Sequence, residues 1–161
     1  MRSNEEPQII NLLEPADYQA GSTDMRSVDM GKLHRLKISI SLGAITGNDA
    51  VFKLYAGATQ GTKTTELSWY YRVSQADFGA TSSDVFGART AVAAGATGLT
   101  LATASSWDHR IITIDVDSQS MPDGKNWLTV ETDDGSASVL LMCAIGEGWP
   151  RYEGTTHVTA V

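Results

Sequence analysis

Strict alternation of apolar and polar residues is the feature of this sequence that most limits its possible folds. Between Leu36 and Leu42 every second residue is apolar, and the residues between them are lysine or serine. Successive side chains of a β-strand point to opposite faces, so this pattern is typical of an antiparallel strand with one buried and one solvated face. No segment longer than about seven residues has a convincing helical period. The sequence therefore predicts an all-β protein.

Further short segments are typical of strands, and turn residues separate them. The stronger ones are residues 50–58, 67–73, 110–116, 126–132 and 138–145, and the weaker ones are residues 9–13, 25–29, 86–92 and 98–102. We expect a hairpin connection at residues 60–63, a turn at residues 133–135 that joins the last two strands, and at most two helical turns in residues 14–20. Many short strands without intervening helices indicate a sandwich or a barrel, and a single jelly-roll-like β-sandwich is the first choice.

The predicted sandwich occupies most of the chain, whose 161 residues suit one domain. Residues 1–8 are polar and contain Pro7, and residues 146–161 follow the last predicted strand without any period. We therefore expect an N-terminal arm at residues 1–8, a β-sandwich domain at residues 9–145 and a C-terminal arm at residues 146–161.

Composition excludes several classes of protein. No apolar run approaches the roughly 20 residues that a membrane helix needs, and the first residues lack the apolar stretch of a secretory signal. The net charge is −7, and residues 105–161 hold three basic and nine acidic groups, which argues against nucleic-acid binding. Cys143 is the only cysteine, so an internal disulfide is impossible and a reducing compartment is expected. Because Cys143 lies in the apolar run of residues 139–145, we expect it to be an inert core residue.

No combination of residues predicts catalysis or metal binding. The three histidines lie in unrelated contexts, and no G-x-S-x-G motif is present. The acidic series from Asp115 to Asp123 has the alternating oxygens of a calcium loop, but Ser120 stands where glycine is required and Asn126 where glutamate is required. We therefore expect no enzyme activity, no metal site and no cofactor.

Two groups of residues are candidates for a protein interface. The first is a basic cluster around Asp29, and it is either a solvated strand face or a docking patch for an acidic protein surface. The second group follows the last predicted strand and contains large, stiff side chains, which contribute most when they fill a pocket on their own domain or on a neighbouring subunit. The candidate interface residues are Arg26, Lys32, Arg35, Lys37, Trp149, Pro150 and Tyr152.

A third surface feature comes from the aromatic strand of residues 67–73. Trp69 and Tyr71 share one face of this strand, and Tyr70 lies on the other. We expect one face to pack in the core and the ring on the other face to serve either a subunit interface or stacking against a sugar.

The order of these features resembles a known family. The chain contains residues 9–17, the loop of residues 42–49, the aromatic strand, and a strand at residues 112–117 that leads through Pro122-Asp123-Gly124 to Trp127-Leu-Thr-Val130; an apolar strand and a tyrosine-bearing tail follow. This arrangement resembles small proteins of tailed bacteriophages that look like head decoration, or cement, proteins.

The resemblance implies a structural virion protein on the capsid exterior, present in the host cytoplasm before assembly. It implies binding to the major capsid protein and association with copies of itself, as a dimer or trimer, with neither nucleic acid nor a membrane as partner. It brings no catalytic residues. A carbohydrate-binding β-sandwich module and a phage tail or adaptor component are the alternatives.

Overall fold

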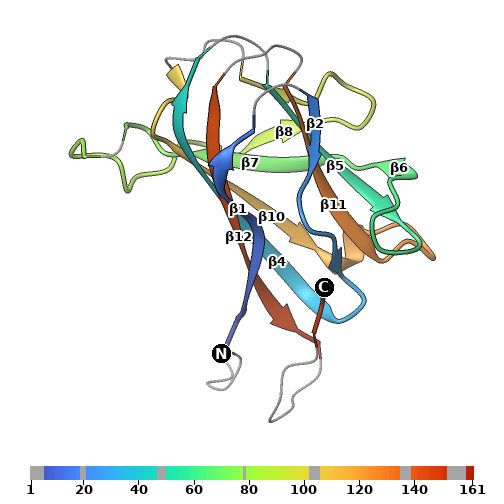
Figure 1. Cartoon of the computed structure of the whole chain (residues 1–161). Coiled ribbons are helices and arrows are strands. Elements are labelled where there is room, and N and C mark those ends of the chain that lie inside the picture. Colours follow the sequence, from blue (N-terminus) through green and yellow to red (C-terminus); the bar gives the residue numbers. More distant parts are fainter. Residues whose placement is uncertain are drawn as a thin grey trace.

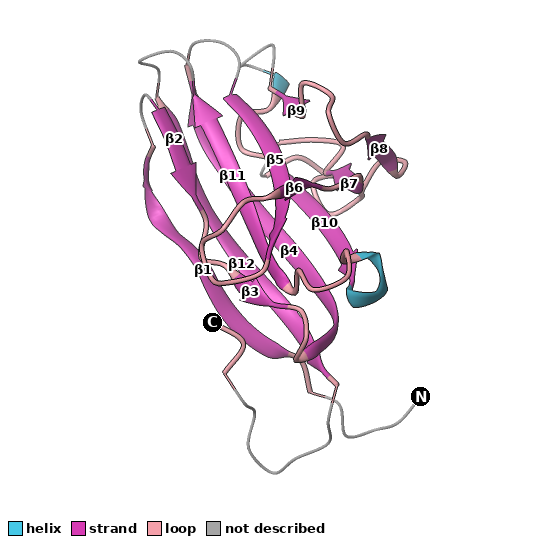
Figure 2. Cartoon of the chain, turned by 90° about the vertical axis from the view of Figure 1, so that its right-hand side faces the viewer, coloured by secondary structure: helices cyan, strands magenta, loops and turns pink. Residues whose placement is uncertain are grey.

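Two antiparallel β-sheets pack face to face in the computed structural model, which describes residues 6–18, 21–46, 50–77, 79–101, 106–134, 139–151 and 159–161 (Figures 1 and 2). The strands are β1 (Gln8–Asp17), β2 (Gly21–Asp24), β3 (Val28–Asp29), β4 (Leu33–Ile45), β5 (Ala50–Gly57), β6 (Thr65–Glu66), β7 (Trp69–Val73), β8 (Thr90–Val92), β9 (Leu99–Thr100), β10 (Ile111–Asp117), β11 (Trp127–Asp134) and β12 (Leu140–Pro150). A short 3-10 helix, η2 (Ser118–Ser120), follows β10.

The strand order is that of a jelly roll. Sheet A has the order β1-β12-β4-β10-β7-β8, and sheet B has the order β2-β11-β5-β6. Strand β3 also pairs with β11, and β9 also pairs with β5. If β2 and β3 are counted together and the additional strands β7, β8 and β9 are set aside, the orders β1-β12-β4-β10 and β2-β11-β5-β6 are those of the two sheets of an eight-stranded jelly roll. The predicted all-β sandwich is confirmed.

The core forms because alternate residues of each strand point between the sheets. In β4, Leu36, Ile38 and Ile40 are almost completely buried, and they face the side of sheet B that carries Phe52 and Leu54. The inward positions of β12 become smaller along the strand, in the order Leu140, Met142, Ala144, Gly146 and Gly148. A Cβ atom on Gly148 would lie 2.7 Å from Cδ1 of Leu33, so the interior has no room for a side chain there.

The connection between β2 and β3 joins the two sheets at one edge of the sandwich. The amide of Met25 donates to the carbonyl of Val130 in sheet B at 2.8 Å, and the amide of Arg26 donates to the carbonyl of Leu12 in sheet A at 2.9 Å. Two neighbouring backbone amides therefore donate hydrogen bonds to strands of different sheets, which closes this edge of the sandwich.

The ends of the sandwich differ from the expected domain boundaries. Strand β12 continues to Pro150, so residues 146–150 belong to sheet A and not to a C-terminal arm. Gly146 and Gly148 are the inward residues of this stretch, and because they have no side chains their alternation is invisible in the sequence. Strand β1 already begins at Gln8. The expectation of helical turns at residues 14–20 is wrong for residues 14–17, because β1 continues through Asp17 and accommodates Pro15 where its register shifts; residues 19 and 20 lie outside the described residues.

Two of the expected connections also differ. Strands β11 and β12 lie in different sheets and are not paired with each other, and Asp133 and Asp134 belong to β11; Gly135 lies outside the described residues. Residues 60–63 do lie in a hairpin connection, but it joins β5 to the short strand β6, while β7 crosses to sheet A.

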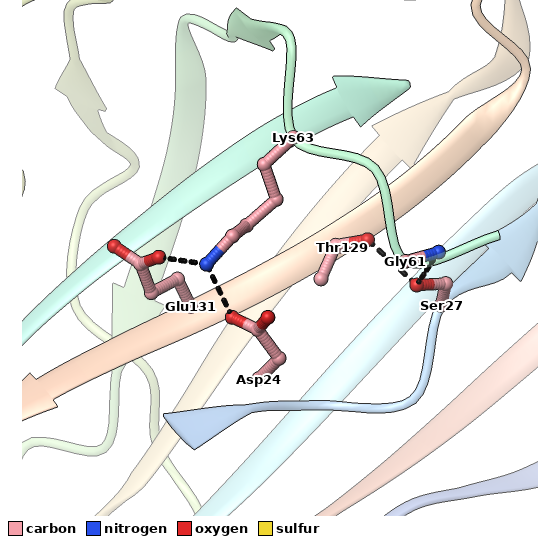
Figure 3. Close-up of polar contacts among 6 residues, drawn as sticks. All are labelled: Asp24, Ser27, Gly61, Lys63, Thr129 and Glu131. Carbon is pink, nitrogen blue, oxygen red and sulfur yellow. Dashed lines mark hydrogen bonds and ion pairs between the residues drawn. The ribbon is translucent and has the colours of Figure 1, made fainter. Parts of the chain in front are cut away.

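The loop of residues 58–64 covers part of the outer face of sheet B (Figure 3). The amide of Gly61 donates to Oγ of Ser27 at 3.1 Å, and this hydroxyl shares a hydrogen bond of 2.7 Å with Oγ1 of Thr129. Thr129 points out of the sandwich and is nevertheless only 1% exposed. The loop therefore shields this outward position from water.

Lys63 fastens the same loop to sheet B. Its ammonium group lies between Asp24, whose Oδ1 is 2.8 Å away, and the carboxylate of Glu131 (Figure 3). Burial lowers the pKa of Lys63, but the hydrogen bonds to the two carboxylates outweigh this effect and raise the pKa above its ordinary value. The charged form of Lys63 is therefore favoured by folding.

Gly57 provides a test of this seating. A Cβ atom there would lie 2.0 Å from the carbonyl oxygen of Thr62, so Gly57→Ala should displace the loop and lower the free energy of unfolding by about 1–3 kcal/mol in urea denaturation. Gly87→Ala is the matched control, because the nearest atom, the carbonyl oxygen of Val73, would lie 3.6 Å away and a change below about 0.5 kcal/mol is expected. Equal unfolding midpoints for the two variants would contradict the seating of the loop on β5.

Lys63→Met should lower the free energy of unfolding by about 1 kcal/mol at neutral pH, because it leaves two carboxylates without their cation. The folded-state pKa is raised, so the stabilisation is complete below the ordinary lysine value of 10.5 and is lost as pH rises through the folded value. Denaturation curves of both proteins between pH 8 and 12 should therefore converge above about pH 10.5. A difference that stays constant over this range would show that the charge of Lys63 is not responsible.

Candidate functional site

The outer face of sheet A exposes large apolar side chains. Ile9 is 64% exposed, Ile145 46%, Leu141 40% and Ile111 38%, and all four extend from strands of this sheet. Exposed apolar residues that gather on one face of a soluble protein mark an interaction surface. The outer face of sheet A is therefore the candidate binding face.

Strand β12 contributes most to this face. Its residues alternate between the core and the outside, so Leu141, Cys143 and Ile145 point outward while Met142 and Ala144 point inward. Cys143 is half-buried on the outer face, which corrects the expectation that it lies in the core. A run that is apolar at every position is typical of a strand covered on both faces. The sequence therefore predicts burial for the whole run, whereas in the structure Leu141 and Ile145 are exposed.

The pairing of β4 with β12 brings together residues that are more than a hundred positions apart. Trp149 lies opposite Arg35, whose guanidinium carbon is 5.5 Å from the centroid of the indole ring. Pro150 lies opposite Leu33, and the amide of Arg151 donates to the carbonyl of Lys32 at 2.9 Å. We name this group the terminal patch, and it consists of Lys32, Arg35, Trp149, Pro150 and Arg151.

The last residues of the chain pack beside the terminal patch. Ala160 is fully buried, and its carbonyl accepts a hydrogen bond of 2.7 Å from the amide of Asp29. Lys32 donates to the carbonyl of Thr159 at 2.8 Å and forms an ion pair of 3.6 Å with Asp29. Residues 159–161 thus bind their own domain, while Tyr152 lies outside the described residues.

The predicted basic cluster does not form one positive patch. Arg26 lies in the connection between β2 and β3, at the closed edge of the sandwich, where its amide donates a hydrogen bond to β1. Arg35 donates to Oδ1 of Asp115 at 2.6 Å, and the cross-strand neighbours of Lys37 are Glu147 and Asp115. Acidic side chains therefore compensate the basic ones on this face, and the patch offers mixed charges beside an aromatic ring.

Two carboxylates of the acidic series from Asp115 to Asp123, for which no metal site was expected, have partners within the protein. Asp115 pairs with Arg35, and Oδ1 of Asp117 accepts a hydrogen bond of 2.9 Å from the amide of Gln119 at the start of η2. Among the described residues, no group of three or more histidine, cysteine, aspartate or glutamate side chains could hold a metal ion.

A hollow of about 470 Å³ lies where β4 and β10 meet the loop after β7. His109, with a φ of 55°, and Asp84 are among its lining residues. Ser74 is also a lining residue, but its hydroxyl oxygen accepts from the amide of Ile111 at 3.1 Å and donates to the carbonyl of Ala76 at 3.3 Å. Ser74 is thus engaged with the backbone and is not placed as a free nucleophile.

The aromatic strand β7 is divided between the core and the surface, as expected. Trp69 is buried, and its ring centroid is 6.0 Å from that of Tyr71, which packs against the core. Tyr70 is 45% exposed, but the guanidinium carbon of Arg89 lies 4.0 Å from its ring centroid. One face of this ring is therefore occupied within the chain, which makes Tyr70 a poor platform for a sugar.

No family model and no curated protein matches this chain. In the part of the chain that the structure describes, no helix has the length and apolar character to cross a membrane. The surfaces of the molecule itself are therefore the basis on which a function can be assigned.

Proposed function

We propose that this chain is a structural protein of a bacteriophage virion that coats the outside of the capsid and stabilises it by binding the major capsid protein. It acts by binding and not by catalysis, it is present in many copies, and it resides in the host cytoplasm before assembly. The observation that carries this proposal is the terminal patch, which lies at the end of the exposed outer face of sheet A.

The terminal patch has the composition of a protein-binding site. Aromatic residues and arginine are enriched where interfaces contribute most of their binding energy, and Trp149 lies here beside Arg35 and Arg151. The β4–β12 ladder holds Trp149 and Arg35 opposite each other before any partner binds. Because this geometry is already ordered, binding costs less conformational entropy than it would on a free tail.

The charge and architecture of the chain suit a coat that is added after the shell has formed. A surface that carries many identical sites converts a modest single contact into strong attachment when copies of the protein are linked. The net charge of −7 keeps the free protein soluble and makes coated particles repel one another.

The proposal is tested with capsids of the phage that encodes this chain, purified without it. Trp149→Ala and Arg151→Glu should each weaken attachment by about 30-fold, which corresponds to about 2 kcal/mol for a central interface residue. Tyr70→Ala, on the same sheet but outside the terminal patch, should bind as the unaltered protein does. The measurement is co-sedimentation with capsids over a concentration series, after circular dichroism has shown that each variant is folded.

Salt provides a second measurement. Since the basic residues near the patch have acidic partners, attachment should fall less than about tenfold between low and molar salt. Loss of attachment at moderate salt would point to a simple basic docking patch. Absence of binding by the unaltered protein would refute the decoration function, and normal binding by both patch variants would place the attachment site elsewhere.

A further inference from the structure

Two adjacent strands on the outer face of sheet A carry side chains that complement each other position by position. In the β4–β12 register, Cys143 lies opposite Ser41 and Ile145 lies opposite Ser39. Leu141 adjoins Gly43, where an added Cβ atom would lie only 2.9 Å from Cβ of Leu141. The larger residue is on β12 in each case, so β12 forms a ridge and β4 forms the floor of a groove beside it.

Two hollows on this face show that the groove is recessed. One hollow of about 330 Å³ adjoins Gly43 and Leu141, and the hollow of about 470 Å³ described above adjoins Ile111. Both hollows are lined by Ser41 and Leu42, so they meet on β4. The groove floor is therefore lower than the β12 side chains on one side and Ile111 on the other.

Charge follows the same division between the two strands. The next outward pair in the register is Glu147 on β12 and Lys37 on β4. In this row the ridge strand carries an acidic residue and the groove strand a basic one. Within this one surface, large side chains of β12 therefore lie beside small residues of β4, and an acidic side chain lies beside a basic one.

A surface of this kind is complementary to itself. A two-fold axis that runs along the strands, between β12 and β4, exchanges the two strands and turns one face over the other. Each ridge then lies over the groove of the other copy, with Ile145 over Ser39 and Cys143 over Ser41. The same rotation brings Glu147 of each copy to Lys37 of the other, so the charge complementarity occurs twice.

We propose that the outer face of sheet A binds a second copy of this chain, in an isologous dimer in which β12 of each copy packs over β4 of the other. The charge pattern favours this occupant over an unrelated partner, because an unrelated partner does not require both complementary halves to lie side by side. The inference goes beyond the decoration function and needs no capsid.

The terminal patch lies at one end of the proposed contact. The register continues from the pair Glu147 and Lys37 to the pair Trp149 and Arg35, so the same rotation brings Trp149 of each copy toward Arg35 of the other. Lys32, Pro150 and Arg151 lie beyond this row, at the end of the two strands. Self-association and attachment to a shell are therefore measured separately, by sedimentation equilibrium without capsids and by co-sedimentation with them.

Cys143 is a built-in probe of this dimer, because it is the only cysteine of the chain. Strands about 4.8 Å apart and sheets about 10 Å apart place the two Cys143 Cα atoms roughly 11 Å from each other. A short bismaleimide cross-linker should therefore convert the purified protein to covalent dimers, and Cys143→Ser should abolish this product. A cross-linked ladder beyond the dimer would contradict the two-fold arrangement.

Sedimentation equilibrium measures the association itself. Ile145→Asp should raise the dimer dissociation constant at least about 30-fold, because it places a charge in the apolar centre of the contact. Val85→Asp is the matched control, since Val85 and Ile145 are both 46% exposed but Val85 lies outside sheet A. We expect the control to dimerise within about twofold of the unaltered protein.

A charge exchange guards against variants that fail to fold. Lys37→Glu or Glu147→Lys alone should weaken the dimer about tenfold, and the double variant should restore it, because the pairing of opposite charges returns. A monomeric unaltered protein at millimolar concentration, or equal association by Ile145→Asp and Val85→Asp, would overturn the inference. Either result would leave the capsid experiment unaffected, because that experiment concerns the terminal patch.

Discussion

The antiparallel pairing of β4 with β12 is the constraint on which the rest of the structure depends. It runs from Leu140 opposite Ile45 to Pro150 opposite Leu33, so it joins the first third of the chain to the last. A shift of one residue would turn every side chain of β12 to the other face, placing Ala144 outside and Ile145 in the core. The small inward residues Gly146 and Gly148 oppose such a slip, because the core beside Leu33 has no space for larger ones.

The same ladder creates the functional surfaces. Trp149 and Arg35 become neighbours only because their strands are paired, and the ridge and groove are the outward halves of the same two strands. Sheet B differs, because the loop of residues 58–64, fastened by Lys63, shields part of its outer face. The outer face of sheet B is thus partly covered by the chain itself, whereas the outer face of sheet A is available for contacts with other molecules.

The sequence allowed the fold class to be predicted because alternation is a local property. The strand from Leu36 to Leu42 could be recognised from its own residues, whereas the partners of each strand depend on contacts distant in the chain. Glycine also conceals strand residues, which is why the sequence predicts an arm at Gly146 where the structure has a strand. Of the candidate interface residues, four come together in the terminal patch: Lys32, Arg35, Trp149 and Pro150. Arg26 is not among them, because the chain turns at Met30, between Arg26 and β4, so closeness in sequence does not place these residues together. The exposure of Leu141 and Ile145 could not be predicted, because a run that is apolar on both faces does not reveal whether its second cover belongs to the same chain.

The backbone hydrogen bonds of Met25 and Arg26, which join the two sheets, limit how this protein can assemble. An open strand edge is a template for another chain, and edges that accept one strand after another lead to fibres. Here the amide of Arg26 donates a hydrogen bond to the carbonyl of Leu12 at the free edge of β1, while the other edge of β1 pairs with β12. Strand-by-strand growth is therefore interrupted at this edge, and contacts between copies are directed to the faces of the sandwich, where a rotation closes on itself after a fixed number of molecules.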